Sequence, residues 1–258
     1  MAAAQRAGPR VPDATLDGRL AAVANRFDGW AAVWVHDLRT GHFAGWNEDL
    51  RFPAASTVKL GALAAALRTS TIPEAGRWWY DARQLGAWSS NLASNRILAG
   101  LGTGAVNDGI RRLGMTSSTY PGPYRATTAA GSPPPGSHTR VTTARDLGRA
   151  LYRLHAGAHG DERALGLLGL TRRQAQSGVR ILLSSQRASD NLGLLRPWLG
   201  RSTPVAEKNG WLSDTRLTAA IVYGNRGPVI VVVAAYRPGV GAVEARRLGR
   251  DILRVAGL

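Results

Sequence analysis

Apolar segments near the two ends of the chain constrain its fold most. Close to the C-terminus, residues 217–225 (LTAAIVYGN) and 229–238 (VIVVVAAYRP) are rich in β-branched residues and flank an Arg-Gly-Pro turn. Close to the N-terminus, residues 31–37 (AAVWVHD) and 41–48 (GHFAGWNE) have the same character. Each pair predicts a β-hairpin. Because these strands stand at both ends of the chain, around a helical middle, we expect the two termini to complete one sheet.

The middle of the chain favours helix. The segment that starts at Ser56 (STVKLGALAAALR) has the Ala and Leu content of a buried helix, with a serine suited to the exposed N–H groups at its start. Residues 74–112 and the stretch from Thr143 to Leu199 also favour helix, and residues 114–136 between them form a Pro, Gly, Ser and Thr-rich loop. Residues 243–257 predict a final amphipathic helix.

These elements predict an α/β (α+β) fold, with an antiparallel sheet from the two termini, flanking helices and an inserted helical subdomain. We expect residues 1–258 to form one composite domain. Its sheet-containing parts would be residues 12–55 and 200–258, and its helical part residues 56–199.

Charge and composition limit the partners of the chain. Lys and Arg number 33 against 17 Asp and Glu, but the arginines are scattered, as at Arg145, Arg149 and Arg153, without a dense basic block or interleaved aromatics. We therefore expect solvated basic faces and no nucleic-acid partner. The chain has no cysteine and no apolar run long enough to span a membrane. Both the cytoplasm and export with removal of a leader fit this sequence, and the oligomeric state stays open.

A serine and a lysine three residues apart carry the first chemical signal. In Ser56-Thr57-Val58-Lys59 a helix places Lys59 on the face of Ser56, where its amine can reach the serine hydroxyl. A neighbouring cation or burial can lower a lysine pKa enough for the neutral amine to accept that proton. The pattern is common by chance, but here it follows a hairpin and opens an Ala-rich buried helix.

Two further motifs follow Ser56 in order. Ser89-Ser90-Asn91 begins 33 residues after Ser56, and Lys208-Asn209-Gly210 stands just before the C-terminal hairpin. A literal Ser189-Asp190-Asn191 competes for the middle place, but it ends 17 residues before Lys208, whereas Ser89 lies 119 residues before Lys208 and leaves room for the helical subdomain. We assign it to the surface.

The ordered motifs resemble those of the class A β-lactamases and the related D,D-peptidases, S-x-x-K, S-x-N and K-T-G. The resemblance spans nearly the whole chain and implies a class A β-lactamase-like fold. It implies that Ser89 relays a proton to the leaving nitrogen, Asn91 holds the substrate amide and Lys208 raises the positive potential. It further implies an oxyanion hole from the backbone N–H groups of Ser56 and Trp211, and that Arg216 can pair with a substrate carboxylate.

The sequence departs from this family at two places. Asn209, which with Gly210 is expected among the substrate-binding residues, stands where a hydroxyl residue is usual, although its amide can still donate a hydrogen bond. Trp211 replaces a small residue, so an indole is expected to narrow the cleft or stack on the acyl group. Between Gly109 and Arg145 there is no Asp or Glu, although class A β-lactamases use a loop glutamate there to activate water. That role is either vacant or taken by Lys59 or by one of three loop residues, Tyr120, Tyr124 and His138.

The sequence thus predicts a serine acyl-hydrolase or acyltransferase that acts on a small-molecule or peptide acyl donor through acyl-Ser56, without metal or cofactor. The alternatives are a true β-lactamase with another deacylating base, and a protein that captures β-lactams or cell-wall peptides with little turnover. Nucleic-acid binding through net charge is a third, for which the sequence offers no recognition pattern.

Overall fold

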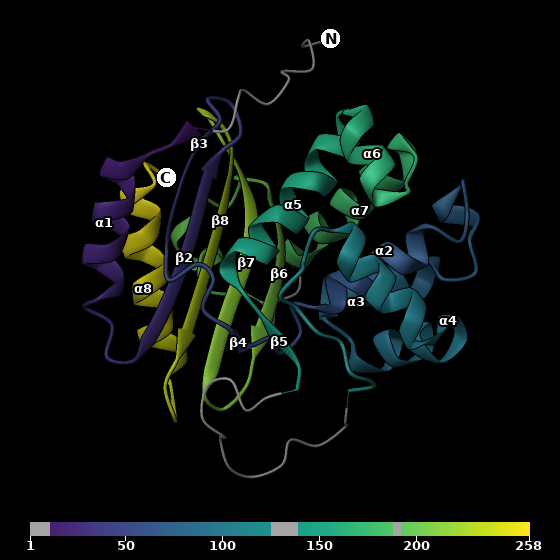
Figure 1. Cartoon of the computed structure of the whole chain (residues 1–258), viewed down its shortest axis with the longest axis horizontal. Coiled ribbons are helices and arrows are strands. Elements are labelled where there is room, and N and C mark those ends of the chain that lie inside the picture. Colours follow the sequence, from purple (N-terminus) through teal and green to yellow (C-terminus); the bar gives the residue numbers. More distant parts are fainter. Residues whose placement is uncertain (1–10, 125–138, 188–191) are drawn as a thin grey trace.

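Helices cover both faces of a six-stranded sheet in the computed structural model, which describes residues 11–124, 139–187 and 192–258 (Figure 1). The strand order is β1-β3-β2-β8-β7-β6. The strands are β1 (Val11–Pro12), β2 (Trp30–Asp37), β3 (His42–Trp46), β6 (Val205–Trp211), β7 (Thr215–Gly224) and β8 (Gly227–Tyr236), and a separate ladder pairs β4 (Phe52–Pro53) with β5 (Val141–Thr142).

The helices divide between the two sides of the sheet. On one side lie α1 (Ala14–Ala24) and α8 (Ala242–Val255), and on the other lie the helices of the middle of the chain (Figure 1). The latter are α2 (Lys59–Leu67), α3 (Trp79–Trp88), α4 (Asn91–Arg112), α5 (Ala144–Ala158), α6 (Glu162–Leu168) and α7 (Arg172–Leu183), with short 3₁₀ turns at Pro73–Ala75, Ser184–Arg187 and Arg196–Trp198.

The pairing of β2 with β8 joins the two ends of the chain. The strands are antiparallel from Trp30 opposite Tyr236 to Asp37 opposite Val229. In β2, Ala32 and Trp34 pack into the core under the middle helices, while Val33 and Val35 pack toward α1 and α8. Because both faces are covered, the strand is apolar at every position from Trp30 to Val35. This confirms the predicted sheet built from both termini.

Some elements differ from the sequence expectation. Helix α1 was not predicted, and β6 adds a third strand to the predicted C-terminal hairpin. Helix α2 begins at Lys59 rather than at Ser56, because the residues before it form tighter turns. Thr57 donates from both its backbone N–H (3.0 Å) and its hydroxyl (2.6 Å) to the Ala54 oxygen, which holds this segment out of the α-helix.

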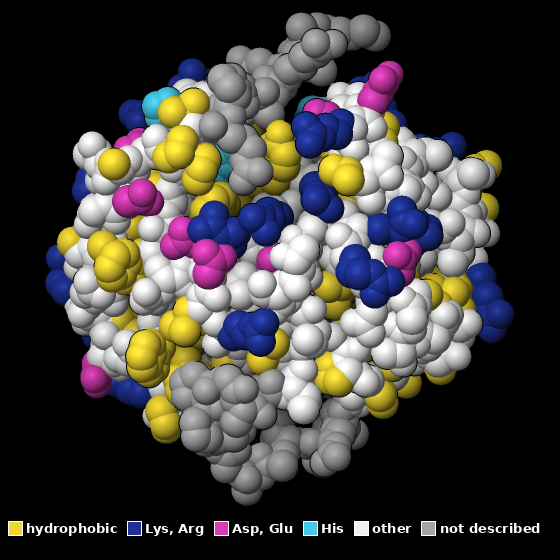
Figure 2. All heavy atoms as spheres, viewed as in Figure 1, with side chains coloured by type: hydrophobic (Ala, Val, Ile, Leu, Met, Phe, Trp, Pro, Cys, Tyr) yellow, Lys and Arg dark blue, Asp and Glu magenta, His cyan; other side chains and the backbone are white. Residues whose placement is uncertain are grey.

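Surface charge in this protein is carried by arginine. The chain has two lysines, Lys59 and Lys208, among 33 basic residues, and both are fully buried. Figure 2 shows the basic side chains of one face in several separate groups, some of them beside acidic side chains. Arg173 and Arg180, for example, share the carboxylate of Glu74. On this face the charge is dispersed, which is the distribution that the sequence predicts.

Helices α2 and α4 touch through glycines. A β-carbon placed on Gly109 would overlap the carbonyl oxygen of Gly61, and one placed on Gly61 would overlap the Ile110 side chain. The missing side chains let the two backbones approach closely. Helix α4 is interrupted at Gly102, where the backbone is non-helical (φ 82°, ψ 157°), so this contact fixes the second part of α4 against the start of α2, close to Lys59.

Gly109→Ala should therefore destabilise the protein. Because the added methyl meets backbone that cannot move aside, we expect the free energy of unfolding to fall by about 1–3 kcal/mol. Gly104→Ala is the matched control in the same helix, since nothing lies within 4 Å of a β-carbon there. It should raise the free energy by about 0.5–1 kcal/mol through helix propensity. Urea denaturation measures both, and equal effects would contradict the close α2–α4 contact.

Candidate active site

Ser56 lies in the turn between β4 and α2, half-buried and flanked by unusual backbone. Ala55, just before it, has a left-handed φ of 46°, which is strained for a residue with a β-carbon. The backbone N–H of Lys59 donates to the Ser56 oxygen (3.3 Å), a 3₁₀ turn that stacks side chains three residues apart. Ser56 and Lys59 therefore share a face of this turn.

Lys59 is buried and turned toward the second motif. Its Nζ donates to the backbone oxygen of Ser89 (2.5 Å) and to Oδ1 of Asn91 (2.6 Å). In the described part of the chain, the Ser56 hydroxyl forms no hydrogen bond with Lys59 or with any other residue. The hydrogen bond between Lys59 and the Ser56 hydroxyl that the sequence predicts is therefore absent among the described residues. The Lys59 amine bonds to Ser89 and Asn91 instead.

Ser89 accepts hydrogen bonds from both lysines of the chain. Lys59 bonds to its backbone oxygen, and Nζ of Lys208 donates to its Oγ (2.5 Å) as well as to the Asn209 oxygen (3.2 Å). Ser89 ends α3 in a left-handed conformation (φ 54°), and Ser90 caps α4 by accepting from the Ala93 N–H (3.1 Å). Because Ser90 is the helix cap, the Ser89 side chain is available to Lys208.

The lysine cluster has unusual electrostatics. Burial, with the positive charges of Lys208 and Arg140, lowers the pKa of Lys59 to about 6. Burial also lowers the pKa of Lys208 to about 7, against the opposing charge of Glu207. Desolvation disfavours the ammonium form in both cases. At neutral pH, Lys59 is therefore mainly a neutral amine that can accept a proton.

The third motif splits across the two faces of β6. Gly210 lies on the face of Lys208, where a β-carbon would stand 3.0 Å from Ala55 Cβ and 3.1 Å from the Ala54 oxygen. A glycine here lets the strand pass close beside Ser56. Asn209 points the other way and is buried, with Oδ1 accepting from the Thr218 hydroxyl (2.8 Å). Strand alternation thus commits the Asn209 amide to the interior, in contrast to the substrate contact expected from the sequence.

Trp211 and Arg216 stack on each other. The Arg216 guanidinium lies 4.8 Å from the centre of the Trp211 indole, and Arg246 of α8 lies 5.5 Å from it. Both Trp211 and Arg216 lie on the face of β6 and β7 that carries Asn209, and both are half-buried. The indole therefore lies close to two cations, with no described contact to Ser56.

Tyr124 is a site residue that the sequence named only among several candidates. Its hydroxyl donates to the Ala55 oxygen (2.8 Å), and the Lys59 Nζ lies 4.4 Å from the centre of its ring. Tyr120, by contrast, bonds to the Ser94 hydroxyl (2.8 Å) deeper in the core. His138 and the competing motif Ser189-Asp190-Asn191 lie outside the described residues.

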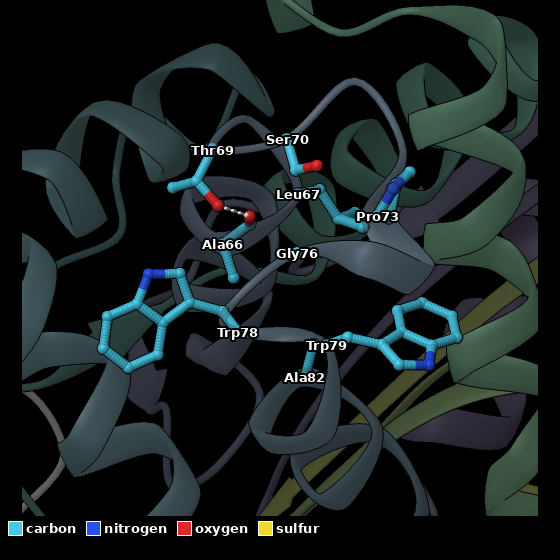
Figure 3. A pocket seen from close by; sticks show the side chains of 9 residues that line it. All are labelled: Ala66, Leu67, Thr69, Ser70, Pro73, Gly76, Trp78, Trp79 and Ala82. Atoms are coloured by element: carbon cyan, nitrogen blue, oxygen red, sulfur yellow. Dashed lines mark hydrogen bonds between the residues drawn. The ribbon is translucent and has the colours of Figure 1, made fainter.

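The hollow shown in Figure 3 lies elsewhere, between the end of α2 and the start of α3. Trp78 and Trp79 line it with Ala66, Leu67 and Pro73, and no predicted site residue does. Among the described side chains, no group of three or more His, Cys, Asp or Glu residues could hold a metal ion. Among the described helices, none is long and apolar enough to cross a membrane.

Comparisons with known proteins agree on one family and fold. The model of the beta-lactamase enzyme family matches residues 15–71 and 82–256. The structure of PBP-A superimposes with a TM-score of 0.72 at 22% identity, covering 96% of this chain and 98% of that one. The β-lactamase of Sphaerobacter thermophilus does so with a TM-score of 0.74 at 20% identity, covering 93% and 94%. No curated protein sequence matches significantly.

A variant of PBP-A was solved as an acyl-enzyme complex with penicillin G. It superimposes with a TM-score of 0.69 at 22% identity, covering 95% of this chain and 97% of that chain. Together these structures show that the chain has the fold of class A β-lactamases, as the sequence predicts.

The depressed pKa of Lys59 should appear in the pH dependence of stability. Between its folded pKa of about 6 and its unfolded value of 10.5, the unfolded chain binds one more proton than the folded protein. Folding is therefore favoured as pH rises through this range. The free energy of unfolding of wild type minus that of Lys59→Met should grow by about 1.4 kcal/mol per pH unit.

Urea denaturation at pH 7, 8 and 9 measures this difference. Lys208 is present in both proteins, so its own titration largely cancels. A difference that stays constant across the three pH values would mean that Lys59 is charged when the protein is folded.

Proposed function

Because the chain belongs to the beta-lactamase enzyme family, we propose that it is a serine acyl-hydrolase or acyltransferase that works through an acyl-Ser56 intermediate. Its acyl donor would be an amide, an ester or a peptide. One observation carries the proposal: both lysines of the chain are buried and donate to Ser89, and one of them, Lys59, lies one turn after Ser56. Burying two lysine amines costs stability, so their presence at these positions favours a functional role.

Acylation would use Lys59 as the base. Its neutral amine would take the Ser56 proton as Oγ attacks the carbonyl carbon of the donor, forming a tetrahedral oxyanion. The backbone N–H groups of Ser56 and Trp211 would stabilise that oxyanion, since Gly210 brings β6 against the Ser56 turn. The Ser89 hydroxyl, held by Lys208, would then give its proton to the leaving group as the bond between that group and carbon breaks. Ser89 would regain a proton from the Lys59 ammonium, either directly or through Lys208, so that the Ser56 ester, a neutral Lys59 amine and the protonated leaving group remain.

Substrate positioning would fall to the remaining residues. Asn91 is exposed beside Lys59 and can hold an amide of the donor. Arg216 would attract a substrate carboxylate, with Trp211 fixing the plane of its guanidinium. The buried Asn209 would support β6 from inside rather than contact the donor.

Release of the acyl group would be slow. Hydrolysis requires a base aligned with water on the ester carbonyl, and the loop that carries a glutamate in class A β-lactamases has none in this sequence. Tyr124 does not replace it, because burial raises the pKa of its phenol and its proton is donated to the Ala55 oxygen. A variant of PBP-A, which shares this fold, forms an acyl-enzyme complex with penicillin G.

Intact-protein mass spectrometry after mixing with penicillin G tests this proposal. We expect a lasting adduct that peptide mapping places on Ser56, because acylation is supported and water activation is not. Ser56→Ala should give no adduct. Rapid hydrolysis without accumulation would support a true β-lactamase with another base. Adduct on a different serine would overturn the assignment.

Adjacent serines provide a matched pair of variants. Ser89→Ala removes the hydroxyl bound to Lys208 and should slow acylation of Ser56 by about a hundredfold or more. Ser90→Ala removes the cap of α4, so it should lower the free energy of unfolding by about 1 kcal/mol and leave the acylation rate nearly unchanged. Stopped-flow labelling with a fluorescent penicillin measures the rates. Similar rate losses in both variants would point to a shared structural effect.

A further inference from the structure

Tyr124 stands between the loop and the reacting residues. Asn95 of α4 clamps its backbone with two hydrogen bonds, from Asn95 Nδ2 to the Tyr124 oxygen and from the Tyr124 N–H to Asn95 Oδ1, both 2.8 Å. The Arg140 guanidinium lies 4.0 Å from the centre of the ring on another side and donates to the Gly122 oxygen (2.7 Å). This loop residue is therefore fixed before its side chain reaches Ala55 and Lys59.

We propose that Tyr124 is a positioning residue of this site: its hydroxyl orients the backbone N–H of Ser56, and its ring screens the Lys59 amine from water. The inference rests on the proposed acyl-Ser56 chemistry, which gives that N–H and that amine their roles. It assigns a task to a loop residue that the acylation steps above do not use.

The hydroxyl acts through a single peptide plane. The Ala55 carbonyl and the Ser56 N–H belong to the same planar trans peptide, so they point in opposite directions. A hydrogen bond from Tyr124 to the Ala55 oxygen thus fixes the direction of the Ser56 N–H. It also polarises the amide, which strengthens the N–H as a donor to an oxyanion. Because the φ of Ala55 is strained, we expect the Ala55–Ser56 peptide to rotate toward a relaxed conformation when the Tyr124 hydrogen bond is removed.

The second role of Tyr124 concerns its ring, which lies against the Lys59 amine. The charged and titratable groups around the Lys59 amine are Lys208 of β6, Arg140 before β5 and Tyr124 itself, while Ser89 and Asn91 supply neutral oxygens. Both cations lower the pKa of the amine, and so does its burial. Because the Tyr124 ring covers the amine at 4.4 Å, removing it would admit water and raise the pKa of Lys59 while both cations remain.

The lysine content of the chain makes this measurable without activity. With two lysines in 258 residues, ¹³C-lysine labelling gives one NMR signal each for Lys59 and Lys208, and Lys59→Arg assigns them. Titration then reports the pKa of Lys59 in wild type, Tyr124→Phe and Tyr124→Ala. A fluorescent penicillin reports the rate of Ser56 acylation in the same proteins as a function of pH.

The two variants separate the two roles. Tyr124→Phe keeps the ring, so the pKa of Lys59 should stay where it is in wild type, but acylation should slow by about tenfold or more as the Ser56 N–H loses its orientation. Tyr124→Ala should also slow acylation, raise the pKa of Lys59 by at least about one unit and move the acid limb of the pH–rate profile upward by the same amount.

Tyr120→Phe is the matched control, because it removes a buried hydroxyl of the same loop that bonds to Ser94 and not to Ala55. It should change neither the pKa of Lys59 nor the acylation rate. A Tyr124→Phe variant that acylates as fast as wild type would overturn the role of the hydroxyl, and an unchanged pKa in Tyr124→Ala would overturn the role of the ring. If wild type is not acylated at all, the proposed function fails instead, and the NMR titration still tests the screening.

Discussion

The convergence of two buried lysines on Ser89 is the interaction on which this structure depends. Lys59 lies at the start of α2 and Lys208 lies on β6, the edge strand of the sheet. Their shared partner, Ser89, therefore connects the helical part to the sheet. Ser89 can serve both because it ends α3 in a left-handed conformation that separates its carbonyl from its hydroxyl. Two neighbouring features support this arrangement. Ser90 caps α4 and so leaves the Ser89 hydroxyl to Lys208, and Gly210 lets β6 pass close to the turn that carries Ser56.

Much of the fold and part of the site could be predicted from the sequence. The apolar strands could be predicted from their composition. The spacing of Ser56, Ser89 and Lys208 led us to choose Ser89 over Ser189 as the serine of the second motif. The predicted start of α2 at Ser56 was wrong. Thr57 hydrogen bonds to the Ala54 oxygen compete with α-helical hydrogen bonds there, and helix propensity does not include such local side-chain bonds. Lysine usage was a stronger signal than any motif: a chain that uses arginine almost everywhere keeps lysine only at these two positions.

Other features depend on tertiary contacts that no local pattern reports. Asn209 turns inward because residues alternate along β6, and its neighbour Lys208 takes the face toward Ser89. Tyr124 could be named from the sequence only as one of several loop residues, because its contact with Ala55 spans 69 positions of the chain. The link from its hydroxyl to the Ser56 N–H runs through a peptide plane, which becomes visible only when the Ala55 oxygen has a known partner.

The charge of the site follows from what surrounds the lysines. Within the described residues, neither Lys59 nor Lys208 forms an ion pair, and Glu207 lies on the opposite face of β6 with its pKa raised by burial to about 7. Burial lowers the pKa of Lys208 to about 7, so its charge is sensitive to other charges that come near it. A negatively charged group that approached Ser89 would favour the ammonium form and raise the pKa of Lys208. For the proposed reaction, binding of an anionic donor and proton uptake by Lys208 would consequently be linked, and each would strengthen the other.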